Sequence, residues 1–270
     1  MLLTLRADGA ELFRKFQRTY VVQQKFSRTI SVGLLLVDLD KYHDIKPEHM
    51  IYSQVLSYSK HKGFGDEDGR STNVHETVHF INNALRNHYK KLLKKNVNGF
   101  YADNGKGIIV ENPPSVTMRD IVPNIPIILR GYRYELYFVK QLGDWNEVPT
   151  YPMDEWTAYI AGAECAVDDI NNGITIPKSD YISGALEFSI YCTALAITVK
   201  EKNLSYWNTN EQFKNAIKYF LIKSEKVFAE GHDKFASDKQ DILLYNLRKH
   251  KDAQKIRQFL LEEFEGIFVD

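Results

Sequence analysis

The chain has 270 residues, of which 44 % are hydrophobic and 13 % aromatic, which is enough apolar material for one large globular domain. Lys plus Arg and Asp plus Glu each number 35, so the formal net charge is zero and no overall basic field favours nucleic acid or an acidic membrane. Cys165 and Cys192 lie in apolar sequence outside any Cys-x-x-Cys pair, which excludes a cysteine-built zinc knuckle and predicts buried thiols in a reducing compartment.

The N-terminal segment lacks the pattern of a secretory signal. Arg6, Asp8 and Gly9 interrupt the apolar run that such a signal requires. The longest apolar runs elsewhere, at 30–37, 125–129 and 194–199, are far shorter than the roughly 20 residues that span a bilayer. We therefore expect a soluble, cytoplasmic protein with no membrane partner, and delivery by a specialised secretion route stays open.

The first part of the chain predicts a mixture of helix and strand. A helix is expected over Glu11–Lys25, and a buried strand over Ile30–Asp38, which is rich in β-branched residues and leucine. A second strand is expected over Met50–Tyr58. The loop Lys62–Arg70 is rich in glycine and acidic residues but lacks the ligand spacing of a calcium loop, which favours a solvated turn.

Helical periodicity begins at Thr72 and continues to Lys95. Apolar residues at steps of four, three and four define one face of this helix: Val74, Val78, Ile81 and Leu85. Four lysines near its end alternate with leucines: Lys90, Lys91, Lys94 and Lys95. This alternation favours the solvated end of an amphipathic helix over a nucleic-acid patch.

The rest of the chain predicts a hairpin followed by helices. The hairpin spans Gly99–Val110 and turns at Asp103-Asn104-Gly105. Within the proline-punctuated stretch Ser115–Gln141, the pattern does not distinguish helix from strand for Arg130–Val139. Helices are predicted over Asp154–Asn171, Tyr181–Glu201, Glu211–Glu230 and Asp238–Glu265. We expect a single catalytic domain over 1–270, with possible sub-lobes at 1–70, 71–177 and 178–270.

The predicted helix Thr72–Lys95 carries the pattern His-Glu-x-x-His as His75, Glu76 and His79. Two histidines four residues apart share a helix face and can reach one metal ion. Glu76 would project beside that metal, where a carboxylate can take a proton from bound water and pass it to a leaving amine. A random chain of this length would contain the pattern in roughly one or two cases per hundred. Its place in a strongly periodic helix strengthens the metal-site interpretation.

A catalytic zinc site normally has a third protein ligand. The best segment begins the later helix, where Glu155 is followed by small residues that would let the two helices approach closely: Ala158, Ala161, Gly162 and Ala163.

Amide hydrolysis also requires donors that face a developing oxyanion. Candidates for this role are Tyr151, Tyr159, Arg130 and Arg133. Structural roles between helices are expected for Asn82, Asn83 and Arg86. We expect Asp168 and Asp169 either to be solvated or to form contacts between helices. His88 is expected to lie at the surface.

This constellation resembles the HExxH zinc metallopeptidases of the glutamate-ligand, gluzincin-like zincins. In these, the third ligand is a Glu on a later helix, often as Glu-x-x-Ala, and Glu155-Trp-Thr-Ala158 matches that form. Tyr159 departs from it, because Asp commonly stands there to orient a ligand histidine, and 75 residues separate His79 from Glu155. The resemblance favours Glu155 over the competing Glu164, and covers the His75–His79 motif more strongly than the later helix.

The resemblance implies an α+β fold with a zincin-like core, made of an active-site helix, a small sheet or hairpin and a helical C-terminal part. It implies a metallopeptidase that holds Zn²⁺ and acts on a peptide or protein substrate. Two alternatives stay open: a zinc-dependent amidohydrolase acting on a small amide or a cell-wall peptide, and a non-enzymatic helical interaction module. No nucleic-acid partner is expected, and the sequence does not define substrate specificity or oligomeric state.

Overall fold

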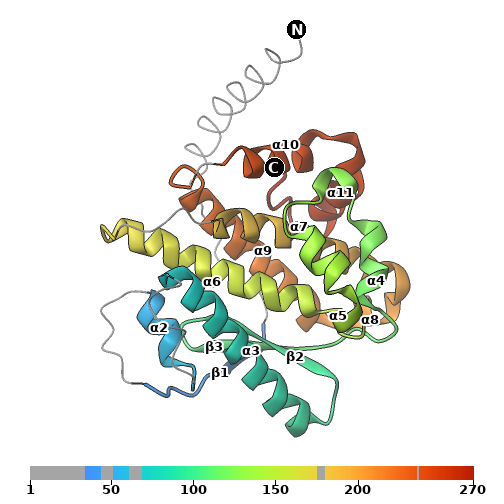
Figure 1. The fold of residues 1–270 in the computed structure, drawn as a ribbon. Helices are drawn as coiled ribbons and strands as arrows, with labels where there is room; N and C mark the ends of the chain where they lie inside the picture. The colour runs from blue at the N-terminus through green and yellow to red at the C-terminus, as the bar shows by residue number, and fades with distance from the viewer. Residues whose placement is uncertain (1–33, 44–50, 61–68, 175–179, 236) are drawn as a thin grey trace.

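The computed structural model describes residues 34–43, 51–60, 69–174, 180–235 and 237–270, and most of them are helical (Figure 1). The α-helices are α2 (Ile51–Ser57), α3 (Arg70–Leu93), α4 (Met118–Ile121), α5 (Leu142–Trp145), α6 (Tyr151–Asn171), α7 (Tyr181–Lys202), α8 (Leu204–Thr209), α9 (Glu211–Gly231), α10 (Asp238–Lys249) and α11 (Gln254–Glu263). Three strands, β1 (Leu36–Asp38), β2 (Val97–Asp103) and β3 (Lys106–Glu111), form one antiparallel sheet in the order β1-β3-β2. The broad α+β prediction is confirmed.

The predicted strand over Met50–Tyr58 is wrong, because Ile51–Ser57 form α2. Ile51, Tyr52 and Val55 pack on one cluster with α3 and α6, at spacings that suit a helix. The carboxylate of Asp168 on α6 accepts a hydrogen bond from the N–H of Ile51 at 3.0 Å, which satisfies one free donor at the start of α2. The predicted helix 11–25, the strand residues 30–33 and the loop residues 62–68 lie outside the described residues.

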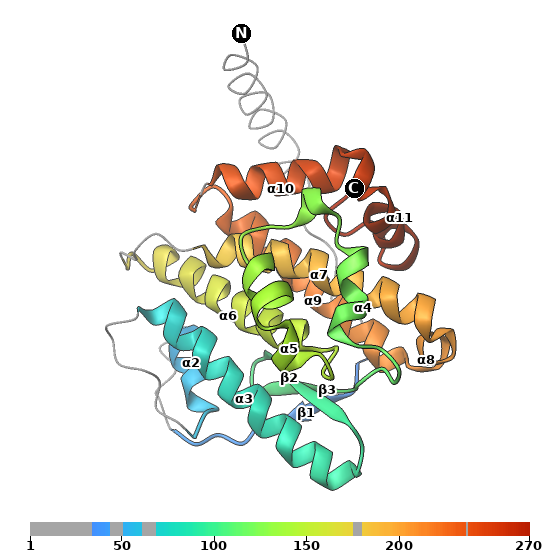
Figure 2. The same cartoon turned by 45° about the vertical axis from the view of Figure 1, so that its right-hand side comes forward.

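Helix α3 confirms the helix predicted over Thr72–Lys95 to within two residues, and its four predicted core residues are buried. It packs against β2 on one side and α6 on another (Figures 1 and 2). Gly99 allows this packing, because a Cβ atom there would lie 2.3 Å from the Cβ of Leu85. The four lysines at the end of α3 are exposed, as expected.

The predicted hairpin is confirmed as β2 and β3. Phe100 pairs with Ile108, and the turn uses Asn104 and Gly105 at φ 44° and 72°, the positive values that a two-residue hairpin turn favours. Strand β2 is buried along most of its length, and the outer N–H of Tyr101 donates to the side chain of Asn82 on α3 at 2.6 Å. This part of the hairpin edge is therefore covered by α3.

Helix α6 joins the layer of α3 and the sheet to the helical C-terminal part. Ala158 and Ala161 share a buried cluster with residues of α3, and a Cβ atom at Gly162 would lie 3.2 Å from the carbonyl oxygen of Ser71. The small residues thus allow close helix packing as predicted, except that Ala163 faces the main core instead. Asp169, fully buried, binds Arg70 at the start of α3 at 2.9 Å, which confirms a role between helices.

The main core is built around α7, which packs against α6 and α9 (Figure 1). Among the described residues, α7 alone is long and apolar enough to cross a membrane, and 94 % of its apolar window is buried inside the molecule. Both cysteines are buried and free, as predicted. The helix predicted over Asp238–Glu265 is divided into α10 and α11, because His250 adopts an extended conformation with ψ 139°.

Candidate metal centre

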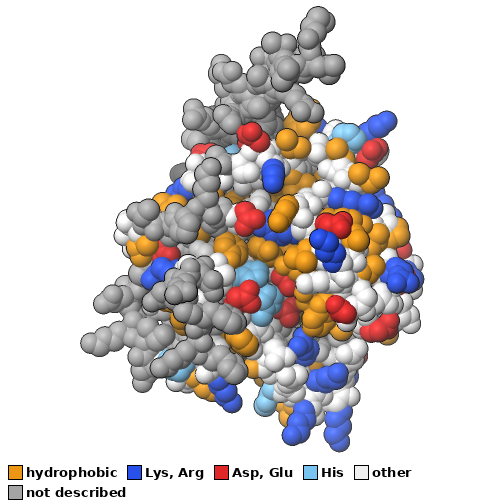
Figure 3. All heavy atoms as spheres, in the orientation of Figure 1, with side chains coloured by type: hydrophobic (Ala, Val, Ile, Leu, Met, Phe, Trp, Pro, Cys, Tyr) orange, Lys and Arg blue, Asp and Glu red, His pale blue; other side chains and the backbone are white. Residues whose placement is uncertain are grey.

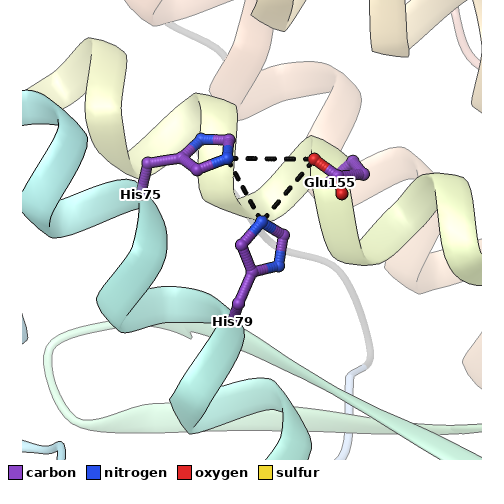
Figure 4. Close-up of side chains that lie close together, drawn as sticks. All are labelled: His75, His79 and Glu155. Atoms are coloured by element: carbon purple, nitrogen blue, oxygen red, sulfur yellow. Dashed lines mark hydrogen bonds and ion pairs between the residues drawn. The ribbon is translucent and has the colours of Figure 1, made fainter. Parts of the chain in front are cut away.

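Helices α3 and α6 bring His75, His79 and Glu155 together, and their side chains point toward one another (Figure 4). The Nε2 atoms of the two histidines are 3.1 Å apart. The Oε2 atom of Glu155 lies 3.8 Å from Nε2 of His75 and 3.6 Å from Nε2 of His79. Two imidazole nitrogens and one carboxylate oxygen therefore face a common point, and this donor set could hold a metal ion.

The two carboxylate oxygens of Glu155 have different surroundings. Its Oε1 accepts a hydrogen bond from the hydroxyl of Tyr151 at 2.8 Å. Its Oε2 is buried and accepts no hydrogen bond from the described residues. Because an unsatisfied buried acceptor is costly, this oxygen is the natural position for a cation. Burial and the Glu155 carboxylate raise the pKa of Tyr137 and Tyr151, so both phenols keep their protons and can act as donors.

The other side of the His79 ring is held by Asp154, whose Oδ1 lies 2.7 Å from Nδ1. A carboxylate on Nδ1 leaves Nε2 available as a ligand atom, which is the usual arrangement around metal-binding histidines. Asp154 is itself buried and held by the side-chain amide of Asn82 at 2.9 Å. Asn82 also donates to Thr157 and accepts from Tyr101, so it pairs helices as predicted.

The surroundings shift the pKa values of the two histidines in opposite directions. Burial and the nearby charges of His79 and Arg133 lower the pKa of His75 well below its usual value. Burial also opposes protonation of His79, but the carboxylates of Asp154 and Glu155 outweigh it and raise its pKa to about 10. The two carboxylates thus create a negative potential that favours positive charge at this site.

Aromatic rings form a wall beside His75. The ring centroid of Tyr159 lies 4.6 Å from that of His75, and the ring of Tyr181 lies 5.6 Å from it. Gly184 makes room for this wall, because a Cβ atom there would lie 2.3 Å from the ring of Tyr159. Burial raises the pKa of Tyr159, and that of Tyr181 to about 12, so both phenols are hydrogen-bond donors at neutral pH.

Glu76 and His79 are partly exposed, whereas His75 and Glu155 are buried. The charge of Glu76 is close enough to Tyr181 to contribute to the raised pKa of that phenol. In Figure 3, histidine and acidic side chains meet at the surface where Figure 1 places α3 and α6, with hydrophobic side chains around them. The cluster is therefore open to solvent on one side, as a site for a reacting molecule requires.

The other predicted candidates are bound to other side chains. Glu164, the competing third ligand, is 3.0 Å from Lys223 of α9. The guanidinium of Arg133 is buried and bound to Glu187 at 2.9 Å, and that of Arg130 lies over the ring of Tyr134.

Sequence reasoning missed Asp154, Tyr137 and Tyr181. The sequence did contain a signal for Asp154, because this residue directly precedes the predicted ligand Glu155 and lies three residues before Thr157 on the same helix. His88 is exposed, as expected.

Comparison with protein-family models, curated proteins and solved structures gave no match for this chain.

Proposed function

We propose that the chain is a zinc-dependent metallopeptidase with a gluzincin-like ligand set, in which His75, His79 and Glu155 bind Zn²⁺. The separation of the three ligand atoms carries this proposal. In a tetrahedral site with bonds of about 2.0–2.2 Å, ligand atoms lie roughly 3.3–3.6 Å apart. The observed separations of 3.1, 3.6 and 3.8 Å bracket this range, so zinc would require only small side-chain movements.

The donor set favours zinc over calcium or magnesium, because imidazole nitrogen suits zinc whereas the other two ions prefer oxygen. Three protein ligands leave one tetrahedral position for water or substrate, the arrangement of catalytic zinc sites. When bound, zinc would polarise a substrate carbonyl and lower the pKa of a water molecule. The unsatisfied Oε2 atom of Glu155 supports a cation at this point.

Glu76 would act as the general base in this mechanism. It follows a ligand histidine directly on α3, is partly exposed, and lies close enough to Tyr181 for its charge to act on that phenol. Glu76 would accept the proton of the attacking water and pass it to the amine that leaves as the peptide C–N bond breaks. One water is consumed, and a carboxylate and an amine are produced.

Two side chains would position the ligands. Asp154 holds His79, and Tyr151, predicted from sequence as a catalytic residue, donates to Glu155 and is assigned a positioning role. Tyr159 keeps its predicted role as a donor to the oxyanion, because it lies beside His75 and holds its proton at neutral pH. Tyr181 is a second candidate for that role.

Replacement of Glu76 by Gln tests the mechanism. The variant is expected to keep its zinc and its fold but to lose at least about 10²-fold in the rate of peptide hydrolysis, because an amide cannot accept the water's proton. Glu147→Gln, at an exposed position, is the matched control and should retain full activity. Near-normal hydrolysis by Glu76→Gln would mean that another group is the base.

A further inference from the structure

A second hollow lies one tyrosine ring away from the candidate metal centre. It is a cavity of about 810 Å³ between residues 128–133, the start of α7 and helix α10. Arg133, in its wall, lies 4.4 Å from the ring of Tyr159, which in turn lies 4.6 Å from the ring of His75. An extended peptide advances about 3.3–3.6 Å per residue, so a chain held at the metal centre would reach the cavity within a few residues.

Two cations of the cavity wall have no acidic partner within the described residues. Arg133 is neutralised by Glu187 at 2.9 Å and by Asp180 at 2.7 Å. Arg130 and Lys239 form no ion pair with the acidic side chains of the described residues, and lie over the rings of Tyr134 and Tyr132 instead. The cavity therefore has an excess of positive charge that a negatively charged group would balance.

The polar side chains of the wall are already occupied by internal hydrogen bonds. The side-chain amides of Gln240 and Asn246 donate to backbone carbonyls, as does the hydroxyl of Ser183. The exposed charged donors of the wall are Lys239 and the guanidinium of Arg130, whose Nε already donates to the carbonyl oxygen of Ile125 at 3.2 Å. Such donors are strongest toward an anionic oxygen.

Apolar side chains border these cations. Ile128 lines the cavity, and Tyr132 and Ile242 do so while remaining 74 % and 60 % exposed. Exposed apolar side chains beside a charged group suit a ligand that has a short aliphatic stem and a charged end.

We propose that this cavity is a substrate subsite that binds a carboxylate, either of an acidic side chain or of a peptide C-terminus, a few residues from the scissile bond. The inference rests on the proposed function, because it takes the substrate to be a peptide seated at the metal centre. The carboxylate would lie between Arg130 and Lys239, with its aliphatic stem against Ile128 and Ile242.

Equilibrium binding to the full-length Glu76→Gln variant tests this subsite without dependence on turnover. A set of peptides carries Glu, Gln or Lys at each position in turn, and each peptide is made with a free or an amidated C-terminus. If the cavity takes a side chain, amidated peptides with Glu should bind about fivefold tighter than those with Gln. If it takes a C-terminus, free-acid peptides should bind tighter than amidated ones by a similar factor.

Two double variants in the Glu76→Gln background locate the effect. Arg130→Glu with Lys239→Glu should abolish the preference for the carboxylate or transfer it to Lys. Lys90→Glu with Lys91→Glu, which makes the same charge change at exposed positions of α3, should leave the preference intact.

Equal binding of acidic and neutral peptides, absence of binding, or a preference that survives reversal of both cavity cations would overturn the inference. A wild-type chain that hydrolyses no peptide would overturn the proposed function instead, since the preference is measured on a variant that does not need to turn over.

Discussion

Two of the three ligand side chains of the candidate centre are held from behind by a second side chain. Asp154 holds the far nitrogen of His79, and Tyr151 holds the far oxygen of Glu155. These contacts reduce the number of conformations that metal binding would have to select, and such outer contacts typically contribute 10- to 100-fold to metal affinity.

Asp154→Asn is expected to weaken zinc binding by about 10- to 100-fold, because an amide cannot match the carboxylate in holding the Nδ1–H of His79. Competition with a chromophoric chelator measures the affinity. Asp144→Asn, at an exposed position, is the control and should leave zinc affinity unchanged. Unchanged affinity in Asp154→Asn would show that Asp154 does not position the ligand.

The variants Glu155→Ala and Glu164→Ala should distinguish the proposed zinc ligand from a carboxylate that only stabilises the fold. Glu155→Ala should lose most of its zinc and its activity. Glu164→Ala should keep zinc but lose about 2–4 kcal/mol of unfolding free energy, because it leaves the buried Lys223 with only the more distant carboxylate of Asp103, at 3.6 Å. Zinc content and urea unfolding of both variants provide the test. A folded Glu164→Ala protein that has lost its zinc would reverse the assignment.

At the scale of elements, Asn82 joins α3, α6 and β2 through three hydrogen bonds. It is fully buried, donates to Asp154 and Thr157, and accepts from the N–H of Tyr101. Asn82→Ala should lower the unfolding free energy by about 2–4 kcal/mol, since it leaves buried polar partners unsatisfied. Its exposed neighbour offers a matched comparison: Asn83→Ala should change stability by less than about 0.5 kcal/mol. Similar urea midpoints for the two variants would contradict this role.

The contact between α9 and α10 predicts a dependence of stability on pH. His232, at the end of α9, binds Asp241 of α10 at 2.6 Å, and the carboxylates of Asp241 and Asp233 outweigh burial and raise its pKa. Because the folded pKa exceeds the unfolded value of about 6.5, the stabilisation is complete below that pH and is lost as pH rises through the folded pKa.

The comparison of wild type with Asp241→Asn isolates this contribution. The wild type should be more stable by about 1 kcal/mol near pH 6, and the difference should shrink as pH rises. Urea unfolding at several pH values measures it. A difference that stays constant or grows with increasing pH would exclude His232 as the titrating group.

The sequence predicted an element correctly where the conformation that the segment prefers locally is also the one in which it packs in the fold. The helices α3, α6, α7 and α9 and the hairpin were predicted to within a few residues, because long periodic segments and the Asn104-Gly105 turn encode them locally. The segment of α2 is short and apolar, so propensity could not separate helix from strand, and Asp168 from a distant helix completes its start.

At the scale of the whole molecule, the sequence located the candidate site but not its surroundings. The spacing of His75 and His79 is local to one helix, whereas the contacts of Asp154, Tyr137 and Tyr181 depend on how α6, α7 and the segment before α5 assemble. No repeating pattern predicts such contacts between distant segments. The sequence therefore supported the choice of ligands better than the choice of the groups that orient them or face a substrate.

The zinc content of the purified chain, measured by elemental analysis beside His75→Ala and His79→Ala, tests the proposed centre most directly. About one zinc per chain is expected in the wild type, and most of it should be lost in both variants, because two remaining ligands hold the ion poorly. A wild-type chain that takes up no zinc when the metal is supplied, or folded variants that retain full occupancy, would contradict a metal centre built from His75, His79 and Glu155.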